Sequence, residues 1–482
     1  MPVQETKGSA SAQGYGFGLG APATYIEDVF STWLYTGNGS TQTITNGIDL
    51  AGKGGLVWIK NRTAAFGNRI YSNGLTASGY RMYTNTTAAQ GNSGNALTYA
   101  SNGWSIVSAN NDSNDTIYNY VSWTFREQPK FFDIVTYTGN GVSGRQIAHN
   151  LGSAPGAIIV KGTSTANAWT VYHRSLNNAS GGSLYLNSTS AQDLDPTNWN
   201  STNPTSSVFT LGSGATNTAG VTYVAYLFAH DAGGFGLSGN ENVISCGSYV
   251  GSNTTDVPLN LGYEPQFMLI KNITTGTTDW YIADIMRGMA YTGIQPLLAP
   301  NLSDAETAYS GAFFKLRANG VDVKYGSGTA ICSAGNTYIY IAIRRGPMKT
   351  PTIGTSVFSP TIYSGNNTNK SITGVGFATD LIINKPRANT LGAGNTGVFW
   401  DRLRGFPDGS TNPGLVASST ADEATWASLF NMFGYINNTN SNPQDGYQVL
   451  NGSTDGRYVN YSSEATGYIS WSLKRVQVFL GQ

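Results

Sequence analysis

The chain of 482 residues carries 27 basic and 27 acidic residues, so its formal net charge is zero, and only 11% of its residues are charged. No basic patch is evident, so nucleic acid is a poor candidate partner. No apolar run reaches the ~18 residues of a membrane span. The first 20 residues lack the hydrophobic segment of a secretory signal. The polarity comes instead from Asn, Thr, Ser and Gly, which suit strands and tight turns, while 40% hydrophobic residues indicate packed cores.

The N-terminal segment, residues 1–28, shows no strand periodicity. It is too short and too polar to bury a core of its own. We therefore expect an arm that anchors the protein to other proteins of a larger particle.

A repeat begins after this arm. The pentapeptide Tyr-Thr-Gly-Asn-Gly occurs at 35–39 and again at 137–141. In each copy there follow a short apolar run that ends in a lysine, an aromatic-rich stretch with an arginine, and an alternating closing strand. The closing strands are 119–126, 223–231, 338–346 and 468–476. Copies three and four keep an aromatic residue and a glycine in the opening strand, at 244–252 and 360–372. Four signatures in one order, four times over, indicate four tandem modules.

The predicted modules are 29–128, 131–231, 242–347 and 356–482, separated by connectors rich in Pro, Gly or charge. Each contains six to eight short strands in ~100 residues with Gly, Asn or Ser between them, which is typical of an antiparallel β-sandwich of the jelly-roll or lectin-like kind. Modules of this length can bury independent cores, so we expect an all-β string of domains. One minor helix is predicted in the last module, within 414–433, where Trp426, Leu429, Phe430 and Phe433 fall on one helix face.

Basic residues recur in the repeat. The recurring residues are Lys60, Lys161, Lys271 and Lys385, at the ends of the apolar runs, and Arg174, Arg287 and Arg404, in the aromatic-rich stretches. They would either contact a ligand or hold strand ends by packing over aromatic rings and pairing locally. Recurrence favours the structural interpretation, because all copies share a scaffold but need not share a ligand.

Catalytic chemistry is poorly represented. The three histidines, His149, His173 and His230, have no serine or cysteine at a nucleophile elbow, and Ser238 in GFGLSGN does not match that motif. Asp401 and Asp408 are one acid pair among 27 acidic residues, which is weak support for a glycosidase. We expect no enzyme and no catalytic residues.

Metal and disulfide chemistry is equally sparse. Asp193–Pro196 and the stretch 111–115 offer carboxylates to Ca²⁺ but lack a calcium-loop pattern, so Asx-turns are the preferred interpretation. Cys246 and Cys332 are interpreted as buried free thiols, with a disulfide as the alternative because both fall in one module. No metal site and no cofactor are predicted.

The linker FREQPKFFDIVTYTGNG (125–141) and the stretch HNLGSAPGAIIVK (149–161) resemble repeat-module proteins encoded by tailed phages of marine bacteria and cyanobacteria. The resemblance is strong over the first two modules and rests on spacing and strand signatures in the last two. It implies a virion structural protein, a tail fibre or appendage, with lectin-like β-sandwich modules and homo-oligomeric, by analogy trimeric, assembly. It implies no catalytic residues and identifies no receptor.

Three functions are consistent with these features. The first is a tail fibre or receptor-binding appendage on the virion that contacts the host cell surface, with a cell-surface glycan as candidate ligand, since Asn, Tyr and Trp suit sugar recognition. The second is a capsid decoration or fibre-to-tail connector. The third is a polysaccharide depolymerase tailspike. A period near 100 residues and sparse acids count against the third, which would show ~20-residue coils and clustered carboxylates.

Overall fold

The computed structural model describes residues 23–475 except 78, 93–95, 108–111, 290–294, 309–312, 327–330, 369, 388–396, 405–412, 417–423, 426–444, 450–459 and 461–466. Within these residues the protein is built almost entirely of antiparallel β-strands, which confirms the predicted all-β class. Short helical turns connect them: η1 (Ile26–Asp28), η2 (Asn178–Ser180), α2 (Pro196–Trp199), η3 (Ile285–Arg287) and η4 (Gly354–Ser356). None of the described helices is long and apolar enough to span a membrane.

The strands of the first two modules alternate with tight turns. The first module contains β1 (Phe30–Thr36), β2 (Gln42–Thr45), β3 (Gly55–Asn61), β4 (Arg69–Ser72), β5 (Tyr80–Tyr83), β6 (Gly91–Asn92), β7 (Leu97–Ala100), β8 (Gly103–Ile106) and β9 (Asn119–Arg126). The second contains β10 (Phe132–Thr138), β11 (Arg145–Ala148), β12 (Ala157–Gly162), β13 (Thr170–His173), β14 (Gly182–Tyr185), β15 (Asp193–Leu194), β16 (Val208–Leu211) and β17 (Thr222–Phe228).

The last two modules have the same kind of strand succession. The third contains β18 (Ile244–Val250), β19 (Val257–Asn260), β20 (Pro265–Asn272), β21 (Trp280–Asp284), β22 (Pro296–Leu297), β23 (Thr307–Ala308), β24 (Phe314–Arg317), β25 (Gly320–Val323) and β26 (Thr337–Arg344). The fourth contains β27 (Phe358–Tyr363), β28 (Lys370–Ile372), β29 (Leu381–Pro386), β30 (Val398–Asp401), β31 (Pro413–Val416), β32 (Ala424–Thr425), β33 (Tyr447–Val449) and β34 (Tyr468–Leu473).

One strand order occurs four times. The large sheets begin β1-β9-β3-β4, β10-β17-β12-β13, β18-β26-β20-β21 and β27-β34-β29-β30. In each, the first strand pairs with the last strand of its module, which pairs in turn with the long apolar strand. The facing small sheets pair β2 with β8, β11 with β16, β19 with β25 and β28 with β33. In the first module the space between the two sheets is filled by buried residues such as Tyr35, Ile44 and Trp104.

The pentapeptide closes the sandwiches of the first and second modules. Tyr35 stacks on Tyr120 and donates its hydroxyl to the Ser113 carbonyl; Tyr137 repeats this with Tyr223 and the Thr216 carbonyl. The glycine that follows is needed because the chain crosses closely there. A Cβ at Gly139 would lie 2.2 Å from the Thr218 carbonyl oxygen.

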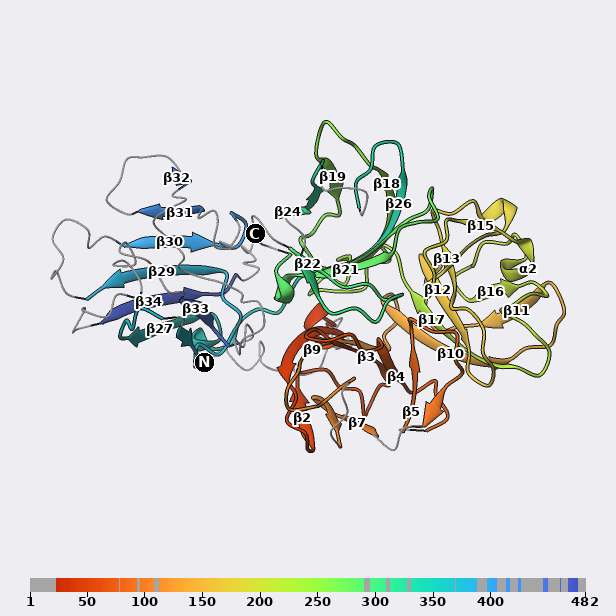
Figure 1. Ribbon diagram of the computed structural model, residues 1–482, viewed down its shortest axis with the longest axis horizontal. Helices are drawn as coiled ribbons and strands as arrows, with labels where there is room; N and C mark the ends of the chain where they lie inside the picture. Colours follow the sequence, from red (N-terminus) through yellow and green to blue (C-terminus); the bar gives the residue numbers. More distant parts are fainter. Residues whose placement is uncertain are drawn as a thin grey trace, which may run out of the picture.

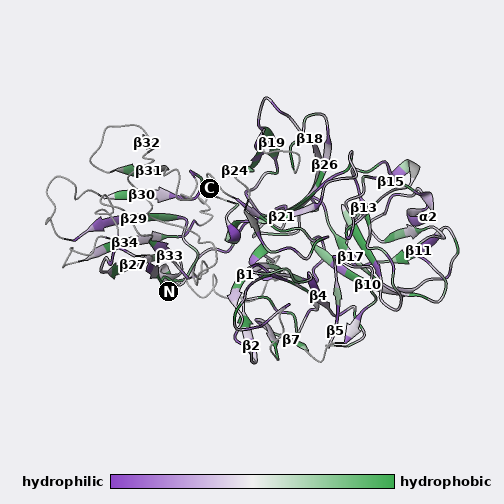
Figure 2. Ribbon diagram, in the orientation of Figure 1, coloured by the Kyte–Doolittle hydropathy of each residue, from purple (hydrophilic) through white to green (hydrophobic). Residues whose placement is uncertain are grey.

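The first three modules are not independent beads, contrary to the string of domains expected from the sequence. Their large sheets pack against one another and bury one continuous hydrophobic core. The Phe125 ring of the first module lies 5.8 Å from Phe228 of the second and 6.1 Å from Phe267 of the third, measured between ring centroids. Figure 1 shows the three modules grouped at the right, and Figure 2 shows hydrophobic residues on strands where they meet.

Three polar contacts close this group into what we call the three-module ring, residues 29–347. Ser72 Oγ lies 2.9 Å from the Tyr226 hydroxyl, His173 Nε2 lies 3.2 Å from the Tyr340 carbonyl oxygen, and Trp123 Nε1 donates to Asp284 Oδ2 at 3.1 Å. Ser72, His173 and Asp284 occupy equivalent positions in the sheet register. The contacts therefore run from module one to two, two to three, and three back to one.

The fourth module lies beside the ring (Figure 1) and is joined to it by buried ion pairs. Arg345 binds Asp380 at 2.5 Å, and Arg402 binds both Asp380 and the third module's Glu264. Arg475 adds a second contact to Glu264 at 3.0 Å. This cluster connects the third and fourth modules through charge pairs, and buried residues of both modules also form one hydrophobic cluster.

Two predictions from the sequence, the N-terminal arm and the helix of the last module, differ from the structure where the structure describes them. The end of the predicted arm packs on the body: Ile26 is buried, Glu27 accepts from the Met348 N–H, and Asp28 pairs with Lys349. Residues 1–22 lie outside the described residues. The predicted helix at 414–433 lies largely outside them too, and its described parts belong to the strands β31 and β32.

Candidate functional site

Three of the four recurring lysines lie at the junctions of the three-module ring. Lys60 donates to the carbonyls of Asn61, Phe66 and Ser303, the last of these in the third module. Lys161 reaches the Thr87 carbonyl of the first module and Lys271 the Thr189 carbonyl of the second. All three side chains are buried. Each ammonium group therefore holds the strand end of its own module to a loop of a neighbouring one.

Burial makes these ammonium groups unusually acidic. Loss of hydration lowers the pKa of Lys60, Lys161 and Lys271 to about 8 in each case. Lys385, which follows the same pattern in sequence, is exposed on β29 of the fourth module. The sequence pattern alone does not separate the buried lysines from the exposed one, because the difference depends on whether another module covers the strand.

The arginines occupy two different positions of the repeat. Arg287 and Arg404 each follow an aspartate by three residues and bind it, with Nε–Oδ2 distances of 2.7 Å and 2.5 Å. Arg174 comes directly after His173, the counterpart of Asp284 and Asp401, so the register equates it with Arg402 and not with Arg404. The prediction that the three arginines are equivalent is therefore wrong for Arg174, which lies two residues before the position equivalent to Arg287 and Arg404.

Arg174 lines a pocket of about 390 Å³ at the edge of the second module. Its counterpart Arg402 is buried in the cluster with Asp380 and Glu264, whereas Arg174 is exposed. Tyr172, Asn203 and His230 also line the pocket, and the Tyr172 hydroxyl lies 3.2 Å from Asn203 Oδ1. The pocket thus combines a guanidinium with amide, phenol and imidazole groups that hydrogen-bond hydroxyls and carboxylates.

His230 presents a neutral imidazole to this pocket. Burial lowers the pKa of His230, and its Nδ1 accepts the Cys246 N–H at 3.2 Å. A neutral ring that accepts at Nδ1 carries its proton on Nε2. The pocket therefore has a second nitrogen donor beside Arg174 at neutral pH.

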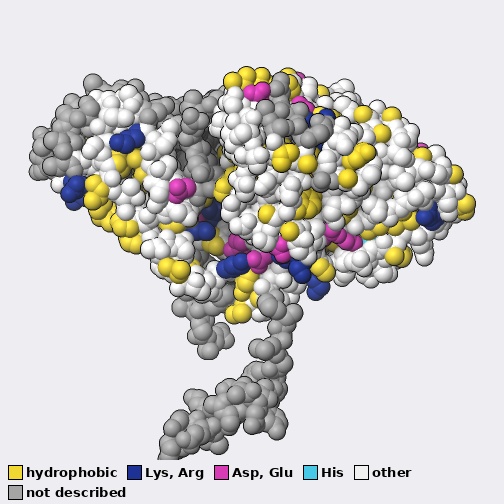
Figure 3. Space-filling model, turned by 90° about the horizontal axis from the view of Figure 1, so that it is seen from below, with side chains coloured by type: hydrophobic (Ala, Val, Ile, Leu, Met, Phe, Trp, Pro, Cys, Tyr) yellow, Lys and Arg dark blue, Asp and Glu magenta, His cyan; other side chains and the backbone are white. Residues whose placement is uncertain are grey.

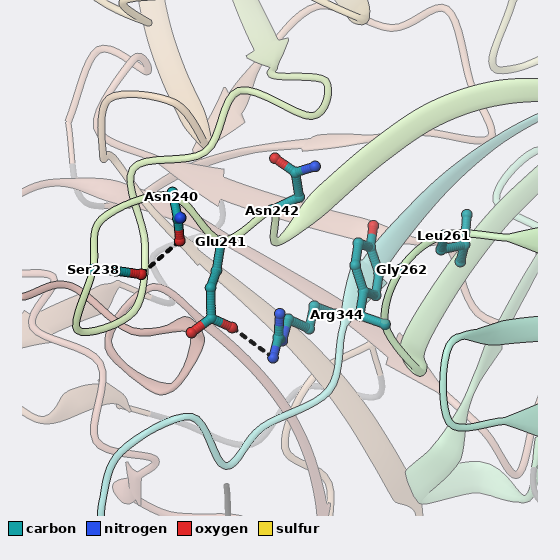
Figure 4. A pocket seen from close by; sticks show the side chains of 8 residues that line it. Ser238, Asn240, Glu241, Asn242, Leu261, Gly262 and Arg344 are labelled. Atoms are coloured by element: carbon teal, nitrogen blue, oxygen red, sulfur yellow. Dashed lines mark hydrogen bonds and ion pairs between the residues drawn. The ribbon is translucent and has the colours of Figure 1, made fainter. Parts of the chain in front are cut away.

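A second pocket of about 450 Å³ borders the connector between the second and third modules. In Figure 4, Ser238 and Asn240 lie on the connector loop and Glu241 faces Arg344. The Glu241–Arg344 pair is 2.8 Å long, and Ser238 donates to Asn240 at 2.6 Å. These polar groups already satisfy one another, so this pocket offers a ligand less than the pocket at Arg174.

The other sequence candidates hold structural contacts. His149 and His173 each accept a backbone N–H at Nδ1, from Leu151 and Ser175. Burial lowers the pKa of both histidines, that of His173 to about 3. Both imidazoles are therefore neutral at pH 7.

The acidic candidates are engaged locally. Asp195 accepts from the N–H of Thr197 as the cap of α2, and Asp112 pairs with Arg69 at 2.5 Å. Asp401 binds Arg404, and Asp408 lies outside the described residues. Among the described residues no group of three His, Cys, Asp or Glu side chains forms a metal-binding cluster.

Cys246 and Cys332 are both free and buried, as predicted. Burial raises the pKa of both thiols, which makes them poor nucleophiles. Neither thiol thus provides a reactive group at neutral pH.

The residues 26–347 match the model of one protein family, described as a domain of unknown function (DUF7483). This match covers two thirds of the chain, so the chain belongs to that family. Its limits are close to those of the three-module ring, and the fourth module lies beyond it. No curated protein and no solved structure matches the chain.

Proposed function

We propose that this member of the DUF7483 family is a non-enzymatic structural protein of a phage particle, a tail fibre or similar appendage that binds a glycan on the host cell surface. The supporting observation is the pocket at Arg174. Arg287 and Arg404 are held by aspartates, but Arg174 is exposed beside Tyr172, Asn203 and His230.

The chemistry of the pocket favours an acidic sugar. A guanidinium binds a carboxylate through two parallel N–H donors, and amide and phenol groups satisfy ring hydroxyls. Because His230 is neutral, Arg174 supplies the positive charge among the titratable residues that line the pocket. Uronic and sialic acids carry this combination of one carboxylate and several hydroxyls.

The resemblance to phage virion proteins supports the location on the particle. In this proposal the N-terminal arm docks onto other virion proteins, and the ring presents the pocket outward. A capsid decoration or fibre-to-tail connector is the alternative, because such a protein would use the same scaffold without a ligand. A depolymerase finds less support, since Asp401 is bound to Arg404.

Binding to an array of acidic and neutral bacterial surface polysaccharides tests the proposal. We expect retention of carboxylate-bearing polysaccharides, and loss of about tenfold in affinity in Arg174→Gln, the size of a charge-assisted hydrogen bond. Lys53→Gln removes another exposed cation and serves as the control. Equal binding by both variants, or no binding by the wild type, would favour the decoration or connector function.

A further inference from the structure

The fourth module exposes the face that the other three modules bury. Its sheet register matches theirs: Phe358 pairs with Leu473 as Phe30 pairs with Phe125. The outward residues of this sheet, which we call the fourth apolar face, are Phe358, Pro360, Ile362, Leu381, Ile383, Phe399, Leu415, Ile469, Trp471 and Leu473. Their counterparts in the first module belong to the core of the three-module ring, except Thr32, the counterpart of Pro360, and the partly buried Leu34, the counterpart of Ile362.

The difference in burial is large. In the first module Phe30 is 3% exposed and Trp123 is fully buried, whereas Phe358, the counterpart of Phe30, is 44% exposed. Ile383 and Trp471 are half-buried. Figure 3 shows hydrophobic side chains gathered on the surface of the fourth module at the left. A contiguous exposed apolar face of this kind marks an interaction surface.

The fourth module also carries both halves of a ring contact. In the ring, Asp284 is bound by Arg287 and accepts the indole N–H of Trp123 from another module. Asp401 with Arg404 repeats the first pair, including the backbone bond from the arginine N–H to Oδ1, at 3.0 Å against 2.9 Å. Trp471 is the counterpart of Trp123, since it pairs with Ile383 as Trp123 pairs with Trp58.

The presence of both groups in one module indicates that a second copy of the chain covers the fourth apolar face. Within one module Asp401 and Trp471 correspond to groups that meet only between modules. The equivalent contacts in the ring run head to tail and close after three modules. A head-to-tail interface with this rotation forms a closed three-membered ring when its parts are identical.

We propose that three copies of this chain associate through their fourth apolar faces about a threefold axis, in the arrangement that the first three modules adopt within one chain. Trp471 Nε1 of each copy donates to Asp401 of the next copy, and Phe358 enters the shared core as its counterparts Phe30 and Phe132 do in the ring. This inference does not depend on the proposed glycan binding, because it uses a different module and a different surface.

The proposed ring of three chains lacks one hydrogen bond that each junction of the three-module ring has. Trp169 and Trp280 donate from their Nε1 atoms to carbonyls at strand ends of the preceding module, and Asn68 donates from its amide to a carbonyl of the third module. The register places Gly397, which has no side-chain donor, at this position of the fourth module. We therefore expect an association that depends on concentration in the micromolar range and not a permanent trimer.

Sedimentation velocity of the full chain at 1–100 µM tests the proposal. We expect the mass to rise toward three times that of one chain. Phe358→Glu should shift the midpoint at least 100-fold upward, because its counterparts Phe30, Phe132 and Ile244 are all buried in the ring and the substitution would bury a charge in the shared core. Ile117→Glu replaces a residue of the first module that is 68% exposed, and serves as the matched control that keeps the wild-type behaviour. Near-ultraviolet circular dichroism verifies that both variants are folded.

A double-mutant cycle tests the orientation of the interface. Trp471→Phe keeps the apolar area and removes the N–H, so it should weaken association about tenfold. In an Asp401→Ala background the same substitution should have no further effect. A wild-type chain that stays monomeric at 100 µM, that stops at a dimer, or that forms trimers unaffected by Phe358→Glu would overturn the proposal. Additive effects of Trp471→Phe and Asp401→Ala would also contradict it.

Discussion

Trp123 and Asp284 lie 161 residues apart in the chain, and the indole N–H of one donates to the buried carboxylate of the other at 3.1 Å. Arg287 binds the same carboxylate oxygen at 2.7 Å and lies over the Trp123 ring, 5.5 Å from its centroid. This contact joins the first module to the third and closes the ring. The buried carboxylate of Asp284 is tolerated because it is paired with a cation and also accepts a hydrogen bond.

Replacement of Arg287 by Met should therefore destabilise the ring strongly. It leaves Asp284 buried without its cation, and removing one partner of a buried pair costs about 3–5 kcal/mol. Arg404→Met removes the half-exposed counterpart and should cost within about 1 kcal/mol. Urea denaturation followed by tryptophan fluorescence measures both. Equal losses in the two variants would contradict this account of Arg287.

Lys161→Met should cost about 2–4 kcal/mol of unfolding free energy. The methionine fits the apolar stem but leaves the carbonyls of Thr87 and Gly162 and the amide oxygen of Asn167 without their donor. Lys385→Met at the exposed equivalent position should change stability by less than about 0.5 kcal/mol. The comparison is made by thermal unfolding of the two variants under one condition. If Lys385→Met is as costly as Lys161→Met, the junction role of the buried lysines is wrong.

Acid should destabilise the protein before its carboxylates titrate. The pKa of His173 is about 3 in the folded chain because burial disfavours the imidazolium, against an ordinary value of 6.5. The unfolded chain therefore binds more protons below pH 6.5, and the unfolding free energy falls as the pH drops from 6.5 toward 3, by up to ~1.4 kcal/mol per pH unit. His173→Gln keeps a donor for the Tyr340 carbonyl and should flatten the fall in Tm between pH 6.5 and 5. His149→Gln should also flatten it, because burial lowers the pKa of His149 in the same direction. An unchanged slope in His173→Gln would refute this assignment.

Gly139→Ala should destabilise the second module by about 2 kcal/mol or more. Its Cβ would meet the Thr218 carbonyl oxygen at 2.2 Å, so one strand end has to move. Gly91→Ala, where a Cβ meets nothing within 4 Å, is the control and should be neutral. Hydrogen exchange of the amides of β10 and β17 locates the loss. Protection that stays unchanged in Gly139→Ala would show that the close crossing at this turn is not required.

The sequence predicts the strands well because their signals are local. The turn at Tyr137, Gly139 and Asn140 follows from residue types that fit its backbone and its hydrogen bonds. The lysine at the end of each apolar run is also visible in sequence. That Lys161 is buried and Lys385 exposed is not, because it depends on which module covers the strand, and no local pattern encodes that.

The shared core is not evident from the sequence for a related reason. Long strands such as β12 are buried on both faces, and the run Ala157–Gly162 already shows this by lacking alternation. Such a run fits the interior of a single sandwich equally well. The better sequence signal lies in the tryptophans: Trp123 on β9 and Trp169 before β13 fall on the outward face, where an isolated domain would carry polar residues. The pocket at Arg174 is hidden in the sequence because His173 occupies the position of Asp284 and Asp401, so no aspartate marks where the arginines should be aligned.

A ring closed inside one polypeptide has an evolutionary consequence. When three identical subunits surround an axis, every substitution appears three times, and a site that suits one sector is imposed on all. Here the sectors are encoded separately, so Arg174 can line a pocket in one of them while Ile285, at the equivalent position of another, stays buried. A single chain that encodes all three sectors leaves each third of the surface free to specialise on its own.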